Sequence, residues 1–243
     1  MWTPSALASE FGSYAASVWR IVEGQHRIST NRLAASAADQ ARLEELIETV
    51  KPNFPKAARQ LHYLLATPFR YGHRTASRFR RADERPGIFY ASERETTALT
   101  EVAYWRLRFF AASRDFVPPS AGVEHTSYKV AVACANAIDL TRPPFDAKVD
   151  DWTDPRDYRP CQAVATAARA AGAGLLRSFS ARDWPTGVNV AVFDPTVFTS
   201  KPTIMRTWQL RFERGALVAF AAFPSKDHLV FTPQQFGMTV SGS

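Results

Sequence analysis

Hydrophobic residues recur with a helical period in the first part of the chain. Residues 37–52 carry apolar side chains at the i, i+3, i+4, i+7 spacing of an amphipathic helix, which Pro52 ends. These side chains are Leu43, Leu46, Ile47 and Val50. A second helix is expected over residues 54–66, which begin with an early proline and bring several leucines to one face.

Start and stop signals predict two further helices. Ser92 and Glu95 form an S-x-x-E capping box, so a helix is expected to begin there and to run to about residue 113. Pro160 suits a first helical position and Gly172 suits the position just past a helix end, which predicts another helix between them.

Short apolar runs predict strands, mostly in the second half of the chain. They cover residues 18–23, 87–92, 127–140, 174–179, 188–193, 208–222 and 228–231. We expect a turn near Asn136 and a bend at Gly215 inside the two longest runs. Residues 141–160 are rich in proline and aspartate and are expected to form a loop that exposes Trp152 and Tyr158.

The order of these elements indicates an α+β fold around a largely antiparallel sheet, since helices come early, strands dominate later and no regular βαβ alternation occurs. The 243 residues fit one domain, and no internal repeat or low-complexity segment divides them. Neither a Rossmann fingerprint nor a P-loop is present in the sequence. A nucleotide ligand would therefore not lie on a glycine-rich phosphate loop.

Composition narrows the class of partner. The formal net charge of +7 favours an anionic one: a nucleotide, a nucleic acid or an acidic protein. Cys134 and Cys161 belong to no Cys/His cluster, so neither a zinc site nor a disulfide scaffold is expected. No apolar run reaches membrane-spanning length and no secretory signal is visible, which favours a cytoplasmic protein.

Five arginines gather in residues 74–85: Arg74, Arg78, Arg80, Arg81 and Arg85. A guanidinium pairs with phosphate oxygens in a bidentate manner, so a pyrophosphate is a natural ligand of this cluster. A solvated basic loop and a nucleic-acid-binding arm are the alternatives. Tyr90 follows at the end of an apolar strand, either as a core residue or as a ring that stacks on a base or a pyridinium.

Glu101 lies among Ala98, Leu99 and Val102, at the border of the apolar stripe of its predicted helix. A helical glutamate commonly pairs with a cation four positions later, but that position is Trp105. Glu101 is therefore either a solvated residue or a partly desolvated carboxylate of the kind that stabilises a developing cation.

Ser178, Ser180 and Arg182 fall between two predicted strands. None of the five histidines lies in a hydrolase or metalloprotease motif, so a serine-hydrolase triad is poorly supported. A serine in this loop either hydrogen-bonds a ribose or phosphate or shapes the loop.

The segments "SRFRR", "GIFYAS…TALTEVAYWR" and "YRPCQAVATAARAAGAGLL…SARD…GVNVAVF" together resemble the RES domain. Members of that family are typically the toxins of bacterial RES–Xre toxin–antitoxin pairs. Their fold is similar to that of ADP-ribosyltransferases: a split, mostly antiparallel sheet around an NAD cleft, with peripheral helices. The resemblance implies a single domain over residues 1–243, with the core motif region at 71–200 and an N-terminal helical insertion at 24–70.

The resemblance also assigns arginines to the ligand. The arginine of the family's R-W-N-like motif matches Arg78, while Arg80 stands where the motif has asparagine. This departure leaves the diphosphate contact open between Arg78 and Arg80. Arg20 matches an arginine of the family's first strand.

Three further residues of the implied site follow from the other motifs. The tyrosine of the v-x-Y-x-S strand matches Tyr90, and the glutamate of the A-l-x-E-v helix matches Glu101. The serine of the S-x-R motif best matches Ser180, and Ser178 is the competitor. The implied catalytic residues are Glu101, Tyr90 and Arg78.

The implied activity is cleavage of the nicotinamide–ribose bond of NAD⁺ by an NAD⁺ glycohydrolase or phosphorylase that acts as a toxin. NAD⁺ is then a substrate, phosphate is a candidate co-substrate, and no cofactor or metal is expected. The implied partner is an Xre-like antitoxin, in a toxin–antitoxin hetero-oligomer, with a homo-oligomer as the alternative. The acceptor stays open between water, phosphate and a protein side chain. A protein ADP-ribosyltransferase and a basic nucleic-acid-binding protein are the alternative functions.

Overall fold

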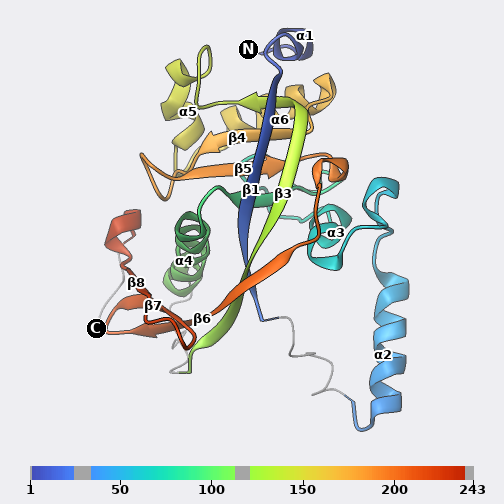
Figure 1. Cartoon of the computed structure of the whole chain (residues 1–243), viewed down its shortest axis with the longest axis vertical. Coiled ribbons are helices and arrows are strands. Elements are labelled where there is room, and N and C mark those ends of the chain that lie inside the picture. Colours follow the sequence, from blue (N-terminus) through green and yellow to red (C-terminus); the bar gives the residue numbers. More distant parts are fainter. Residues whose placement is uncertain (1, 25–33, 113–120, 239–243) are drawn as a thin grey trace.

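One sheet runs through the molecule, with helices on its outside (Figure 1). The computed structural model describes residues 2–24, 34–112 and 121–238. Its strands are β1 (Gly12–Glu23), β2 (Phe89–Ser92), β3 (Val123–Asp139), β4 (Leu175–Phe179), β5 (Val188–Val192), β6 (Thr203–Glu213), β7 (Ala216–Ala221) and β8 (His228–Phe231). All pairings are antiparallel except that of β3 with β4. The expected α+β class and mostly antiparallel sheet are confirmed.

The strand pairings close a ring. The order in the sheet is β1-β2-β5-β4-β3-β6-β7-β8, and β1 pairs with β3 as well as with β2. A closed ring of pairings is therefore formed by β1, β2, β5, β4 and β3. The sheet continues beyond the ring through β6, β7 and β8, which begin at the first half of β3. The joint between β1 and β2 is the single pair Trp19 with Ser92. This narrow joint leaves space at one side of the ring.

The helices lie around the sheet, as expected of peripheral helices (Figure 1). They are α1 (Pro4–Ala8), α2 (Ala37–Val50), α3 (Tyr63–Arg70), α4 (Glu95–Ala112), α5 (Val149–Thr153) and α6 (Arg159–Ala171). Helix α6 has Pro160 in its first turn and ends at Gly172, whose φ of +87° is left-handed. Every helix within the described ranges is too short or too polar to span a lipid bilayer.

Three apolar clusters hold the layers together. The first packs α3 against one face of the ring, with Phe69, Phe89 and Tyr128 among its buried residues. The second packs α5 and α6 against β4 and β5. The third joins α4 to β6, β7 and β8 through residues such as Leu99 and Leu217. Helix α4 is thus fixed between the ring and the extension of the sheet.

The expected insertion is only partly as predicted. Helix α2 is present, but none of its residues is buried, so its apolar stripe does not contribute to the core. The single helix expected over 54–66 is wrong, because a 3₁₀ turn (Lys56–Ala58) and α3 replace it. Residues 25–33 of the insertion lie outside the described residues.

Two predictions in the second half were wrong and one was confirmed. Strand β3 runs through Asn136 without a turn, because β1 and β4 pair with this part of the strand. The expected loop contains α5, and Trp152 is buried with its indole Nε1 donating to the carbonyl of Phe145. The bend at Gly215 is real: β6 ends and β7 begins on either side of it, and its φ is +78°.

Candidate functional site

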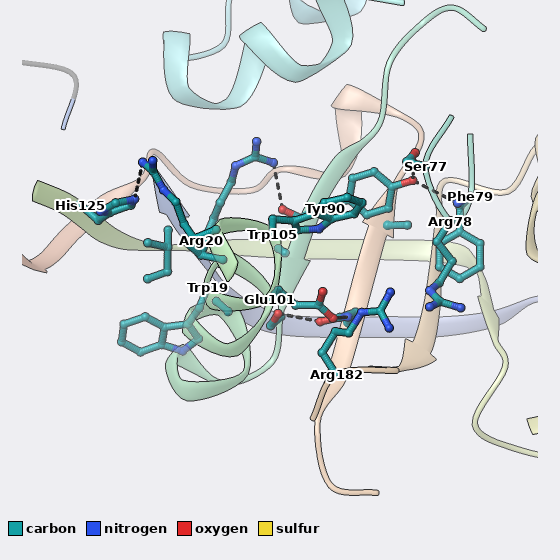
Figure 2. A pocket seen from close by; sticks show the side chains of 18 of the residues that line it. Trp19, Arg20, Ser77, Arg78, Phe79, Tyr90, Glu101, Trp105, His125 and Arg182 are labelled. Atoms are coloured by element: carbon teal, nitrogen blue, oxygen red, sulfur yellow. Dashed lines mark hydrogen bonds between the residues drawn. The ribbon is translucent and has the colours of Figure 1, made fainter. Parts of the chain in front are cut away.

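A cavity of about 620 Å³ opens beside the joint between β1 and β2. Its walls come from β1, β2, β3, β5 and α4, from the loop before β2, from the loop after β4 and from Tyr158 before α6. Its volume lies within the range of small-molecule sites, which is roughly 300–1,000 Å³. Figure 2 shows Glu101 between two ends of this cavity: Arg78 and Arg182 lie toward one, Trp19 and His125 toward the other.

Glu101 is held by one of its two carboxylate oxygens. The hydroxyl of Ser180 donates to Oε1 at 2.7 Å, and Nδ2 of Asn189 donates to the same oxygen at 2.6 Å. Among the described residues, nothing donates to Oε2. One oxygen is therefore anchored in the protein and the other remains able to meet a ligand.

Ser180 supports Glu101 and does not line the cavity. Its side chain is fully buried, and its Oγ also accepts from the backbone N–H groups of Arg182 and Asp183, at 3.1 Å each. Ser178 is buried as well, but it neither lines the cavity nor bonds to Glu101. Of the two candidate serines, only Ser180 is connected to the carboxylate.

Arg78 and Arg80 have different environments. Arg78 lines the cavity, where its Nη1 donates to the carbonyls of Trp152 and Asp154 at 2.8 and 3.0 Å. The other guanidinium nitrogens of Arg78 make none of the described hydrogen bonds. Arg80 is 3% exposed and does not line the cavity.

The guanidinium of Arg80 is occupied by its own loop. It donates to the carbonyls of His73, Thr75 and Arg81, at 2.9, 2.6 and 2.9 Å. These bonds cross-link residues 73–81 and hold the loop that presents Arg78 to the cavity.

Tyr90 and Arg20 both line the cavity. The Tyr90 hydroxyl shares a 2.8 Å hydrogen bond with Ser77 and accepts from the backbone N–H of Phe79, and burial raises the pKa of this phenol to about 12. Arg20 donates to the carbonyl of Tyr90 at 2.9 Å and lies 4.8 Å from the centroid of the Phe89 ring. The ring of Tyr90 can therefore contact a ligand, but its hydroxyl is committed to the loop before β2.

Arg182, for which the sequence suggested no role, is a second cationic residue of this wall. Its guanidinium lies 3.6 Å from the centroid of the Tyr104 ring and donates to the Tyr158 hydroxyl at 3.0 Å. The guanidinium of Arg78 lies 4.8 Å from the centroid of the Tyr158 ring. Tyr158 thus links the two arginines into one cationic end of the cavity.

The opposite end is aromatic and contains one ion pair. Trp19 and Trp105 line it, and the guanidinium of Arg106 forms an ion pair with Glu23. His125 lies against Arg106, and burial lowers the pKa of its imidazole. The cavity therefore has an end suited to phosphate and an end suited to a flat ring, with Glu101 between them.

Asn189 is the residue that sequence reasoning missed most completely. It lines the cavity from β5, donates to Glu101 and accepts from the Ser92 hydroxyl. Its segment, GVNVAVF, belongs to the family resemblance, but nothing in that segment singled out the asparagine from its apolar neighbours. In the described ranges, no group of three or more His, Cys, Asp or Glu side chains could hold a metal ion.

Comparison with known proteins places the chain in a family. The family model of the RES domain matches residues 54–213, which include Arg78, Tyr90, Glu101 and Ser180. No curated protein matches the chain. Among solved structures, a chain of the crystal structure of the M. tuberculosis MbcT–MbcA toxin–antitoxin complex is similar, with 15% identity and a TM-score of 0.45 over 84% of this chain and 92% of that one.

Proposed function

Since the chain belongs to the RES domain family, we propose that it cleaves the nicotinamide–ribose bond of NAD⁺ and acts as the toxin of a toxin–antitoxin pair. One observation carries the proposal: Glu101 is anchored through Oε1, while Oε2 accepts from no described residue, in a cavity that has a cationic end and an aromatic end. This arrangement fits a dinucleotide whose reacting carbon lies at Glu101.

The chemistry needs little proton transfer. When the bond between ribose C1 and the pyridinium nitrogen breaks, its electron pair moves to that nitrogen and nicotinamide leaves as a neutral molecule. The ribose carbon acquires cationic character, as in glycoside cleavage. The anionic carboxylate of Glu101 would stabilise that charge, a preorganised effect typically worth 10²–10³ in rate. Water then adds at C1 and releases a proton, which gives ADP-ribose.

Arg78 and Arg182 would hold the diphosphate. Both line the cavity at the same end, and each has guanidinium nitrogens outside the hydrogen bonds described for it. Bidentate guanidinium–phosphate bonds would fix the distance from the diphosphate to the reacting carbon. Arg80 would serve this site only indirectly, through the loop it holds together.

Tyr90 would contact the ligand with its ring. Arg20 would hold the backbone of Tyr90 in place. The hydroxyl of Tyr90 is already bonded to Ser77, so stacking on the nicotinamide is the role that its exposed surface permits. Arg20 holds the carbonyl of Tyr90 and lines the same wall. A cationic pyridinium over an aromatic face is a favourable contact in the ground state.

The acceptor is decided by product analysis. Purified protein is incubated with NAD⁺, with and without inorganic phosphate, and the products are identified by mass spectrometry. Water as acceptor gives ADP-ribose, phosphate gives ADP-ribose-1″-phosphate, and a protein side chain gives an ADP-ribosylated target. Release of nicotinamide in any of these reactions supports the proposal, and intact NAD⁺ after long incubation contradicts it.

The partner in this proposal is an Xre-like antitoxin that covers the cavity in the cytoplasm. The net charge of +7 favours a partner with an acidic contact face, because complementary charges steer and orient association. A neighbouring reading frame of Xre type, and a product that inhibits NAD⁺ loss when co-purified, would support this partner. A neighbouring product that leaves the rate unchanged at saturating concentration would exclude it.

A further inference from the structure

Asn189 occupies a position between two buried serines on adjacent strands. In the sheet register, Ser92 of β2 and Ser178 of β4 lie directly opposite Asn189 of β5, one on each side. The hydrogen bonds use only one side: Ser92 donates to Oδ1 of Asn189 at 2.7 Å, and Nδ2 of Asn189 donates to Glu101 at 2.6 Å. A continuous chain of donors therefore runs from Ser92 to the carboxylate.

We propose that Asn189, held by Ser92, is a positioning residue that fixes the Glu101 carboxylate in its reactive orientation. The effect on the reaction rests on the proposed function, but the orientation of the Glu101 carboxylate by Asn189 does not. An ionised carboxylate can only accept hydrogen bonds, so the Asn189 amide must turn its NH₂ group toward Glu101. The amide oxygen then faces Ser92, whose hydroxyl is the donor that keeps it there.

The two donors to Oε1 come from different parts of the sheet. Asn189 lies on β5 and Ser180 lies in the loop after β4, while Glu101 itself is carried by α4. Donors in two directions prevent the carboxylate from rotating, and Oε2 keeps one position relative to the cavity. A displacement of about 1 Å at a reacting group can cost on the order of 10²-fold in rate, so this restraint matters for the reaction.

Ser178 provides a matched control for Ser92. Both serines are buried, at 1% and 2% exposure, and both lie opposite Asn189 in the register. The Ser178 side chain makes no described hydrogen bond to Asn189 or Glu101, so its hydroxyl is not part of the chain of donors. A general effect of removing a buried hydroxyl would appear in both Ser92→Ala and Ser178→Ala. A positioning effect would appear only in Ser92→Ala.

The kinetic test compares Asn189→Ala, Ser92→Ala, Ser92→Thr and Ser178→Ala by NAD⁺ turnover, with urea unfolding as a check of folding. Loss of the amide is expected to lower kcat about 10- to 100-fold with KM within about twofold, because the contact acts on the transition state. Ser92→Ala is expected to lose several-fold in kcat, Ser92→Thr to recover most of it, and Ser178→Ala to match the parent. Equal losses in Ser92→Ala and Ser178→Ala, or full kcat in folded Asn189→Ala, would overturn the proposal.

Asn189→Asp adds a readout that a purely structural role would not change. The introduced carboxyl can donate to Oε1 only while it is protonated, and a nearby carboxylate raises its pKa. Its activity should therefore fall as the pH rises between about 5 and 8, whereas the parent should show no such fall. Parallel pH profiles of the variant and the parent would contradict the assignment.

Crystal structures separate this proposal from the proposed function. In Asn189→Ala the Glu101 carboxylate is expected to turn away from its position in the parent, and in Ser178→Ala it is expected to stay. This result does not depend on which substrate the cavity takes. If the parent does not cleave NAD⁺ but the carboxylate moves as expected, the proposed function fails and the positioning role stands; an unmoved carboxylate overturns the positioning role.

Discussion

Arg78 and Arg80 should respond to the same substitution in opposite ways. Arg80→Met removes three hydrogen bonds from a charged donor that is 3% exposed, to the carbonyls of His73, Thr75 and Arg81. At about 1.5 kcal/mol for each bond, the lower end of the range for a charged donor, the expected loss of unfolding free energy is about 4–5 kcal/mol. Arg78→Met removes two bonds to carbonyls, both from Nη1, and the side chain that it shortens lines the cavity and is not part of the core.

The predicted effects of these two substitutions on activity are reversed. Arg78→Met should lower kcat/KM for NAD⁺ about 10- to 100-fold, since a guanidinium–phosphate pair is worth about 1.5–3 kcal/mol and 1.36 kcal/mol is tenfold. Arg80→Met should lose less of its kcat/KM than Arg78→Met under conditions where it is folded, because Arg80 acts only through the loop that carries Arg78. Urea unfolding measures the loss of unfolding free energy in Arg80→Met. With a slope of about 3 kcal/mol per M, the urea midpoint of this variant should fall by about 1–2 M. A folded Arg80→Met that is as stable as the parent, or an Arg78→Met with full kcat/KM, would refute this reading of the loop.

Further predictions concern the residues of the cavity wall and the stability of the protein at alkaline pH. Arg182→Met should raise KM for NAD⁺ about tenfold with little change in urea stability, because its guanidinium would contact the diphosphate; an unchanged KM in steady-state kinetics would remove Arg182 from the site. Tyr90→Phe should keep most of the kcat and Tyr90→Ala should lose it, since the ring and not the hydroxyl faces the ligand; equal activities would contradict this. The pKa of Tyr90 is raised from 10.0 to about 12, so stability should fall as the pH rises from about 10 to 12, where the unfolded chain releases this proton first; unfolding curves of Tyr90→Phe should show a smaller fall than the parent.

Much of the fold could be predicted because its signals are local. The strand pieces at 174–179, 188–193 and 228–231 lie within a residue of β4, β5 and β8, and the glycines at 172 and 215 mark a helix end and a bend. These signals depend on side-chain period and on the freedom of glycine at positive φ. The failures have a common cause: Asn136 and Trp152 take their places from distant partners that the local sequence does not show.

The capping box illustrates how a local signal can give the correct element for the wrong reason. It placed the helix that carries Glu101 at Ser92 and Glu95, and α4 does begin at Glu95. The hydroxyl of Ser92, however, is bonded to Asn189, and the Glu95 carboxylate accepts from the indole Nε1 of Trp208. The Glu95 side chain thus joins α4 to β6, and the Ser92 side chain joins β2 to Asn189 of β5 at the cavity.

The candidate site could be predicted only as far as its motifs reach. Glu101 and Ser180 were expected to belong to one site, and the structure joins them by a hydrogen bond across 79 positions of the chain. The choice between Arg78 and Arg80 needed the structure, since two arginines two positions apart differ in what surrounds them and not in their sequence context. The place of Asn189 in the site is shown only by its hydrogen bond to Glu101 in the structure.

If the charge of Glu101 drives cleavage of NAD⁺, nicotinamide release by the Glu101→Gln variant should reveal it. Glutamine keeps the size of the side chain and an acceptor for Ser180 and Asn189, but it removes the negative charge. We expect a folded variant that releases nicotinamide about 10²–10³-fold more slowly than the parent under saturating NAD⁺. Release at the rate of the parent would show that the charge of Glu101 does not drive the cleavage.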